Sequence, residues 1–147
     1  MRRGTVAAAL VALALSVAAC SNMSGDLAQR VAEWSSGASL SANDAQIVAD
    51  IKAVAVGIKQ GELAPTRTAC AAFVIDAGTA QGELPTPDTQ LTNALNDAYT
   101  DFAEGAQDCS LATSFSSADF ARYRSKLAAG EARLATAERL LKSLGDG

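Results

Sequence analysis

The stretch that decides the fold is residues 91–109, LTNALNDAYTDFAEGAQDC. Its apolar and small residues recur at intervals of four and three positions: Leu91, Leu95, Ala98, Phe102, Gly105 and Cys109. Side chains three and four positions apart lie on the same face of an α-helix. The spacing therefore predicts an amphipathic helix with one buried face, which ends at a cysteine.

A second helix of the same kind follows a turn at residues 110–115. Ser116 is its expected N-cap, with Asp119 three positions later, and Phe115 and Phe120 hold the two positions of a hydrophobic staple. The buried row again has spacings of three and four: Phe120, Tyr123, Leu127, Gly130, Leu134, Ala137, Leu141 and Leu144. Because the connecting turn is short, we expect this helix to pack antiparallel against residues 91–109.

Two helices are expected near the start of the domain. A short helix is predicted by the apolar residues Leu27, Val31 and Trp34. It should stop at residues 35–37, and Trp34 should pack on the bundle. The next helix is expected to begin at Ser41 and to end at Gly61, since glycine suits the left-handed residue that follows a helix. Its buried stripe comprises Ile47, Ile51, Val54 and Ile58.

One more helix begins near Pro65, which a first helical turn tolerates because its missing N–H would have no partner there. Its buried row consists of Cys70, Phe73 and Ala77. Residues 83–88 form a loop, and Thr86 or Asp88 caps the following helix. No segment shows the strict alternation of a strand. The fold class is therefore all-α: an antiparallel four-helix bundle with a short N-terminal helix.

The first nineteen residues have the layout of a lipoprotein signal peptide. Arg2 and Arg3 precede an apolar run that ends at Ala19 and is too short to span a membrane. The run closes with Val-Ala-Ala-Cys20, which resembles the bacterial lipobox, where the cysteine is acylated and becomes the new N-terminus. An ordinary signal peptide followed by a chance cysteine is the alternative.

These features divide the chain into three parts. Residues 1–19 are expected to be the lipoprotein signal peptide, residues 20–40 a lipidated tether with the short helix, and residues 41–147 the helical bundle domain. Several acyl chains of the palmitate type on Cys20 would anchor the protein stably. We therefore expect it on the extracytoplasmic face of a cell membrane.

Two cysteines remain once Cys20 is assigned to lipid. Cys70 and Cys109 form an even pair in an exported, oxidising setting, and a redox role lacks the C-x-x-C spacing, so a structural disulfide is predicted. The helix from Cys70 to Gly82 would extend about 18 Å, whereas that from Pro87 to Cys109 would extend about 33 Å. We therefore expect the earlier helix to end near Gly78, with residues 79–87 running beyond it.

Composition excludes several functions. The chain contains no histidine, no G-x-S-x-G, no G-K-[ST] and no G-x-G-x-x-G, so neither an enzyme nor a cofactor is expected. Without Arg2 and Arg3, ten of the twelve basic residues remain against sixteen acidic ones, a net charge of −6. Such a domain would be repelled by nucleic acid.

One acidic cluster has two interpretations. Four carboxylates follow the residue 91–109 helix at spacings of four and three, and we call them the acidic flank: Asp97, Asp101, Glu104 and Asp108. They could hold a divalent cation or a basic partner. Alternatively, they form a solvated flank beside the buried row, paired with Lys126 and Arg133 of the next helix. On this second interpretation Asp101 lies near Lys126, in an exposed ion pair.

Taken together, several motifs carry a resemblance to a known group. They are Trp34-Ser-Ser-Gly37, Thr68-Ala-Cys70, Leu84-Pro-Thr-Pro-Asp88, Cys109 and Ala128-Ala-Gly130. This pattern resembles the small Cys-paired helical secreted proteins and lipoproteins of actinobacteria and their phages, whose function is unassigned. The resemblance implies export, helices and a disulfide, but it supplies no functional residue.

Three functional hypotheses follow. The leading one is a membrane-anchored lipoprotein that acts as a non-enzymatic interaction or structural module, with another envelope protein as partner. The second is binding of a small apolar or lipid-like molecule between the helices, where Gly57, Gly105 and Gly130 could leave room. The third is a phage- or prophage-encoded surface lipoprotein that excludes superinfecting phages.

Overall fold

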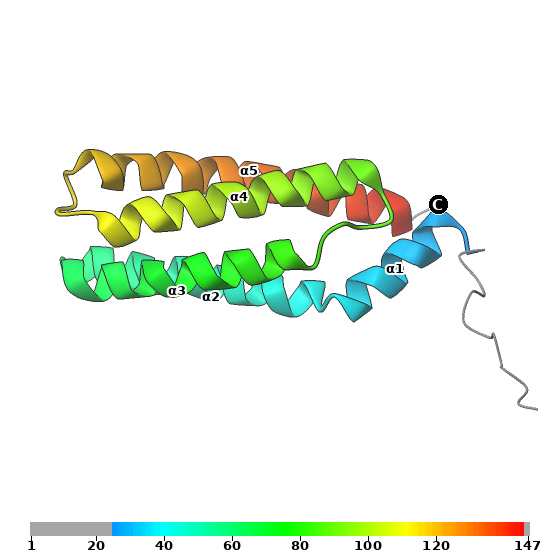
Figure 1. Ribbon diagram of the computed structural model, residues 1–147, viewed down its shortest axis with the longest axis horizontal. Coiled ribbons are helices and arrows are strands. Elements are labelled where there is room, and N and C mark those ends of the chain that lie inside the picture. The colour runs from blue at the N-terminus through cyan, green and yellow to red at the C-terminus, as the bar shows by residue number, and fades with distance from the viewer. Residues whose placement is uncertain (1–24, 146–147) are drawn as a thin grey trace, which may run out of the picture.

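The computed structural model describes residues 25–145 and folds them into five helices (Figure 1). Their bounds are α1 Leu27–Gly37, α2 Leu40–Gln60, α3 Leu63–Gly82, α4 Thr89–Leu111 and α5 Ala118–Gly145. Helices α2 to α5 run up and down in turn, and no strand occurs within the described residues. The all-α helical bundle is confirmed. The signal peptide and Cys20 lie outside the described residues.

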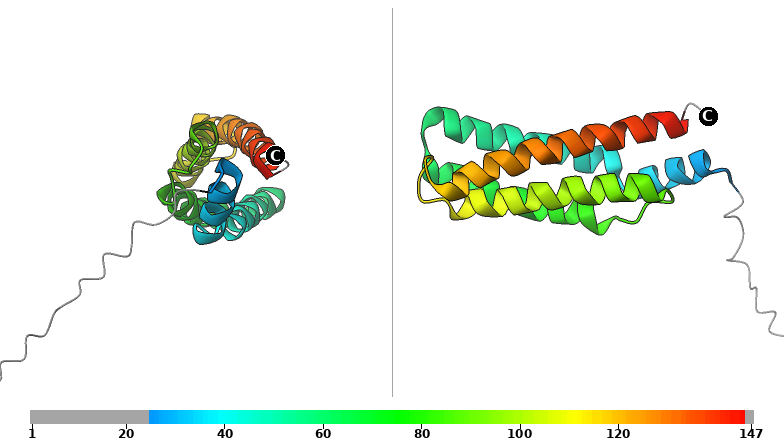
Figure 2. Two further views of the ribbon diagram at one scale, coloured as in Figure 1. Left: turned by 90° about the vertical axis from the view of Figure 1, so that its right-hand side faces the viewer. Right: turned by 90° about the horizontal axis from the view of Figure 1, so that it is seen from above.

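Helices α2 and α5 are the most widely spaced pair of neighbours in the bundle. Each of the helices α2 to α5 packs against the next in the chain, but the backbones of α2 and α5 do not approach each other closely. Helix α1 contacts both α2 and α5, and the end-on view in Figure 2 shows it between them. Val31 of α1 and Leu40 of α2 are buried in the main core. The core therefore includes residues upstream of residue 41.

Helix α4 is the central element of the core. The entire row predicted from its sequence is buried, from Leu91 to Cys109, and Tyr99 and Ala106 are buried beside it. Asp88 caps the helix, with its carboxylate accepting the Leu91 N–H at 2.7 Å. On α5 the predicted row contains both buried and half-buried residues. We attribute the partial exposure to the wide spacing of α2 and α5, whose backbones do not approach each other closely.

The start of α5 differs by one residue from the prediction. Ser117 caps the helix rather than Ser116, since its hydroxyl accepts the Phe120 N–H at 3.2 Å. The two staple residues do meet: the rings of Phe115 and Phe120 pack edge to face with centroids 5.2 Å apart. The aromatic contact predicted for this turn is thus present, with the cap shifted by one position.

Helix α2 also departs from its predicted pattern. It begins at Leu40, after Ser39 in a left-handed conformation, so the start at Ser41 was wrong. Its end at Gly61, with φ of 70°, is confirmed. Ile58 is 36% exposed and does not belong to the buried row. Gly57 occupies the buried position that was predicted for Ile58. The reason is close packing: a Cβ at Gly57 would collide with Thr66 of α3.

The disulfide between Cys70 and Cys109 is present, with Cα atoms 5.9 Å apart. The early end of α3 at Gly78 was wrong, because the helix continues to Gly82. Gly78 and Gly82 have open space beside their Cα atoms, while Ala80 extends the buried row. From Cys70 to the end of α3 the helix is about 18 Å long, whereas from the start of α4 to Cys109 it is about 30 Å long. The loop of residues 83–88 spans the difference, because six extended residues can reach about 20 Å.

Trp34 holds this connection in place. Its indole N–H donates to the carbonyl of Glu83 at 3.1 Å, and its ring packs against the main core. Within the loop, the hydroxyl of Thr92 accepts the Thr86 N–H at 2.9 Å. The prediction that Trp34 packs on the bundle is confirmed, and the residue ties α1 to the loop between α3 and α4.

Replacing Gly130 by alanine is expected to lower the free energy of unfolding by about 1–3 kcal/mol, because the core is already filled there. A Cβ at this position would lie 2.5 Å from Cε1 of Phe102. Urea denaturation would measure the change. Gly78→Ala is the matched control: it lies in a helix with open space around it, so alanine should stabilise by about 0.5–1 kcal/mol. Equal effects of the two changes would contradict the close packing of α4 on α5.

Candidate functional site

Three features could carry function: the acidic flank, the end of the bundle beside the disulfide, and a pair of carboxylates between α2 and α3. In the acidic flank, Asp101 is the central residue. Its carboxylate lies 3.0 Å from Nζ of Lys126 and 2.7 Å from Nη1 of Arg133, both on α5. The predicted proximity of Asp101 to Lys126 is confirmed. The expectation of an exposed pair was wrong, because Asp101 is only 3% exposed.

Close approach of the two helices explains this burial. A Cβ at Gly105 would lie 2.8 Å from the Cβ of Lys126, so the glycine lets α5 come near α4 and enclose Asp101. The Lys126 ammonium also lies 2.6 Å from the Glu104 carboxylate. These hydrogen bonds to Glu104 and Asp101 raise the pKa of Lys126.

The remaining members of the acidic flank follow the same pattern. Arg122 binds both carboxylate oxygens of Asp108, at 3.0 and 3.1 Å, and also pairs with Asp119. Asp97 is exposed, and its backbone carbonyl accepts a hydrogen bond from Arg133 at 3.2 Å. Cations of α5 therefore neutralise three of the four carboxylates. The acidic flank joins α4 to α5, and it offers no free set of ligands.

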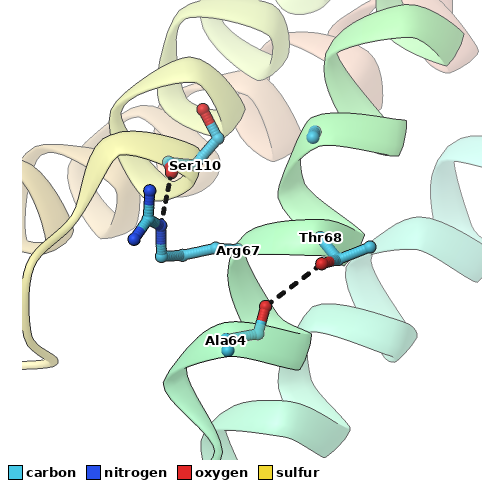
Figure 3. A pocket seen from close by; sticks show the side chains of 5 residues that line it. Ala64, Arg67, Thr68 and Ser110 are labelled. Carbon is cyan, nitrogen blue, oxygen red and sulfur yellow. Dashed lines mark hydrogen bonds between the residues drawn. The ribbon is translucent and has the colours of Figure 1, made fainter.

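The second feature is a shallow hollow between α3 and the end of α4 (Figure 3). Its volume is about 430 Å³, and its lining residues are Ala64, Arg67, Thr68, Ala71 and Ser110. Arg67 reaches from α3 to α4, where its Nε donates to the Ser110 carbonyl at 2.7 Å. This places a cation near the C-terminal carbonyls of α4, a favourable position for positive charge. Within the described chain its two Nη groups have no hydrogen-bond partner.

Three exposed apolar residues lie at the same end of the bundle, on α2 and on α4. Leu111 is 58% exposed at the end of α4, and Val56 and Ile58 are exposed near the end of α2. The α2–α3 and α4–α5 turns also lie there, opposite the end that holds α1 and the C-terminus (Figure 1). We call this end, with Val56, Ile58, Leu111 and the Arg67 hollow, the distal tip. Sequence periodicity missed it, because Ile58 was assigned to the buried row and Leu111 to a turn.

The third feature is a pair of carboxylates between α2 and α3. Asp50 is 6% exposed, and Gln46 donates to Asp50 at 3.3 Å and to Asp76 at 3.2 Å. Burial away from water and then repulsion from the Asp76 carboxylate raise the pKa of Asp50 to about 6. Asp50 falls on the buried face of α2, so its position in the row between Ile47 and Val54 was the sequence signal that could have found it.

We expect the Asp50 pair to make stability depend on pH. Because the folded-state pKa of Asp50 lies above its ordinary value of 3.8, its contribution is complete below about pH 3.8 and is lost as the pH rises through about 6. Asp50→Asn is neutral at every pH. In buffer without divalent cations it should unfold like the wild type near pH 4 and be about 1–2 kcal/mol more stable at pH 8.

Urea denaturation across this pH range would measure the effect. Asp97→Asn is the control, since Asp97 is exposed on α4 and its change should leave the pH profile as it is. If the free energy of unfolding of Asp50→Asn changed with pH in parallel with that of the wild type, the raised pKa of Asp50 would be contradicted.

Two structural features are absent from the part of the chain that the structure describes. None of the helices formed by residues 25–145 combines the length and the apolar character needed to cross a bilayer. The same residues contain no group of three or more His, Cys, Asp or Glu side chains placed to hold a metal ion. Comparison with protein-family models, curated proteins and solved structures gave no match to this chain.

Proposed function

We propose that this protein is an extracytoplasmic lipoprotein, anchored through Cys20, whose helical bundle is a non-enzymatic module that binds another envelope protein at its distal tip. The observation that carries the proposal is the composition of that tip. It combines exposed Leu111, Val56 and Ile58 with an arginine whose Nη groups have no partner in the described chain. Isolated exposed apolar residues are common on proteins, but Leu111 directly follows Ser110, whose carbonyl accepts the Arg67 hydrogen bond. An exposed apolar residue beside an arginine is typical of a contact surface.

The direction of the tip agrees with an N-terminal anchor. Four residues lie between Cys20 and Gly25, where the described chain begins, so the two Cα atoms are at most about 18 Å apart. Helix α4, which ends near the tip, is about 35 Å long. An anchor at Cys20 would therefore hold the α1 end near the membrane, and the tip would be free to meet a protein farther out.

The chemistry of the tip defines the partner's surface. Leu111 fits an apolar contact, while the planar guanidinium of Arg67 suits a carboxylate that it can bind through two parallel hydrogen bonds. The hollow is shallow and opens to solvent, which suits a protruding side chain better than an enclosed small molecule. We therefore expect a protein surface with an Asp, a Glu or a C-terminal carboxylate beside an apolar residue.

The interior gives the alternative of a lipid-like ligand little support. The three glycines that favoured it each lie against a neighbouring helix: Gly57 against Thr66, Gly105 against Lys126, and Gly130 against Phe102. At these positions the missing side chain is used for close helix contact. The space between the helices is thus occupied where the sequence suggested room.

In-cell photo-crosslinking tests the proposal. A photoreactive residue at position 111 should capture one envelope protein, while the same residue at position 75, which is 69% exposed on α3 away from the tip, should not. Arg67→Glu should abolish the crosslink at position 111, and Arg67→Lys should weaken it. Equal capture from both positions, or capture insensitive to Arg67, would refute the tip as the contact surface.

Cys20→Ala tests the anchor: labelled fatty acid should be lost and the protein released from the membrane fraction.

A further inference from the structure

The molecule holds two buried carboxylates that differ in how their charge is balanced. Asp101 lies between two cations supplied by α5. Asp50 faces a second carboxylate, that of Asp76. Its buried Oδ2 has no hydrogen-bond partner and, unlike Oδ2 of Asp101, no ion pair. No Lys or Arg among residues 25–145 forms an ion pair with either Asp50 or Asp76. Since a buried charge without compensation is costly, Asp50 requires either a proton shared with Asp76 or a cation from solution.

The geometry around Gln46 suits a metal ion. Its Nε2 lies 3.3 Å from Oδ1 of Asp50 and 3.2 Å from Oδ2 of Asp76, so one amide atom faces both carboxylates. Turning the amide about its last bond places Oε1 at the same point. Adjacent oxygen ligands of an ion with bonds of about 2.3 Å stand about 3.3 Å apart in an octahedral shell, which fits Ca²⁺ better than the smaller Mg²⁺.

We propose that Asp50, Asp76 and Gln46 form a Ca²⁺ site between α2 and α3. Two carboxylates and one amide oxygen are a set of hard ligands, and water completes the shell from the side on which Asp76 is half-exposed. The bound ion removes the repulsion between the two carboxylates. With three protein ligands, the dissociation constant is expected between about 10⁻⁴ and 10⁻³ M, the range of extracellular calcium modules.

Thermal unfolding of the purified protein at pH 7.5 tests the site. At a Ca²⁺ concentration ten times the dissociation constant, the ratio of folded to unfolded protein rises about eleven-fold, which shifts Tm by about 5 °C. Mg²⁺ should shift Tm less. At pH 5 the Ca²⁺ effect should shrink, because protons compete with the ion for Asp50.

Four variants make the test specific. Asp50→Asn and Asp76→Asn should each lose the Ca²⁺ shift, and Gln46→Glu should enlarge it by adding a third carboxylate. Asp97→Asn, an exposed member of the acidic flank, should respond as the wild type does. Asp50→Asn is expected to fold at least as stably as the wild type, so its lost response would be informative. Absence of a Tm shift in the wild type at 10 mM Ca²⁺, or an equal shift in Asp50→Asn, would overturn the site and leave a proton as the compensating charge.

Discussion

Replacing Cys70 and Cys109 together by alanine should lower the free energy of unfolding by about 4 kcal/mol. The bridge links residues 39 positions apart, and closing a loop of that length removes about this much conformational freedom from the unfolded chain. Folded domains of this size are stable by only about 5–15 kcal/mol, so the bridge supplies a large share. We expect the variant to remain folded at 25 °C but to unfold at a much lower urea concentration.

Loss of the bridge should lower the local stability of the distal tip more than that of the rest of the bundle. Cys70 and Cys109 belong to the smaller of the two core clusters, where Phe120 and Tyr123 are the largest members. Hydrogen exchange in the last turns of α4 should therefore accelerate more than exchange near Leu91, which lies in the larger cluster.

Reduction of the wild type supplies the control for this prediction. The reduced protein keeps its cysteine side chains, so it separates loss of the bridge from loss of packing. It should lose nearly as much stability as the alanine variant. A loss below about 1 kcal/mol in both would mean that the core alone holds α3 to α4.

The spacing of apolar residues predicted the buried face of a helix correctly where that helix packs between two others. The row from Leu91 to Cys109 is buried in full because α4 packs between α3 and α5. It failed on α2, where Ile58 and Gly57 are adjacent and both fit a helical stripe. Which of the two is buried depends on the side from which α3 approaches, and a single helix does not encode that direction.

The candidate sites show the same limit. The pairing of the acidic flank with Lys126 was predictable from the sequence. Each acidic residue, and Lys126 itself, comes one position before a residue of the buried row of its helix, and the two helices are antiparallel. The burial of Asp101 was not predictable, since it depends on how closely Gly105 lets α5 approach. Arg67 and Leu111 lie near helix ends, where no periodic signal marks a surface. The burial of Asp50 was not predicted, because a charged residue was not expected in the buried row of α2.

Removing both cations that surround Asp101 should cost about 3 kcal/mol of unfolding free energy. Lys126→Met and Arg133→Met keep the length of the side chains but remove their charges, and together they leave a buried carboxylate without compensation. Either change alone should cost about 1 kcal/mol, because the other cation still faces Asp101. The pair should therefore be non-additive, as expected for residues that share one partner.

Two comparisons separate this effect from ordinary loss of surface ion pairs. Arg122→Met removes the partner of Asp108 at an exposed position and should cost far less than the double variant. Adding Asp101→Asn to the double variant should restore more than half of the lost stability, because the stranded charge is then gone. If the double variant were no less stable than Arg122→Met, or if Asp101→Asn restored nothing, the Asp101 network would be a surface contact and not a buried link between α4 and α5.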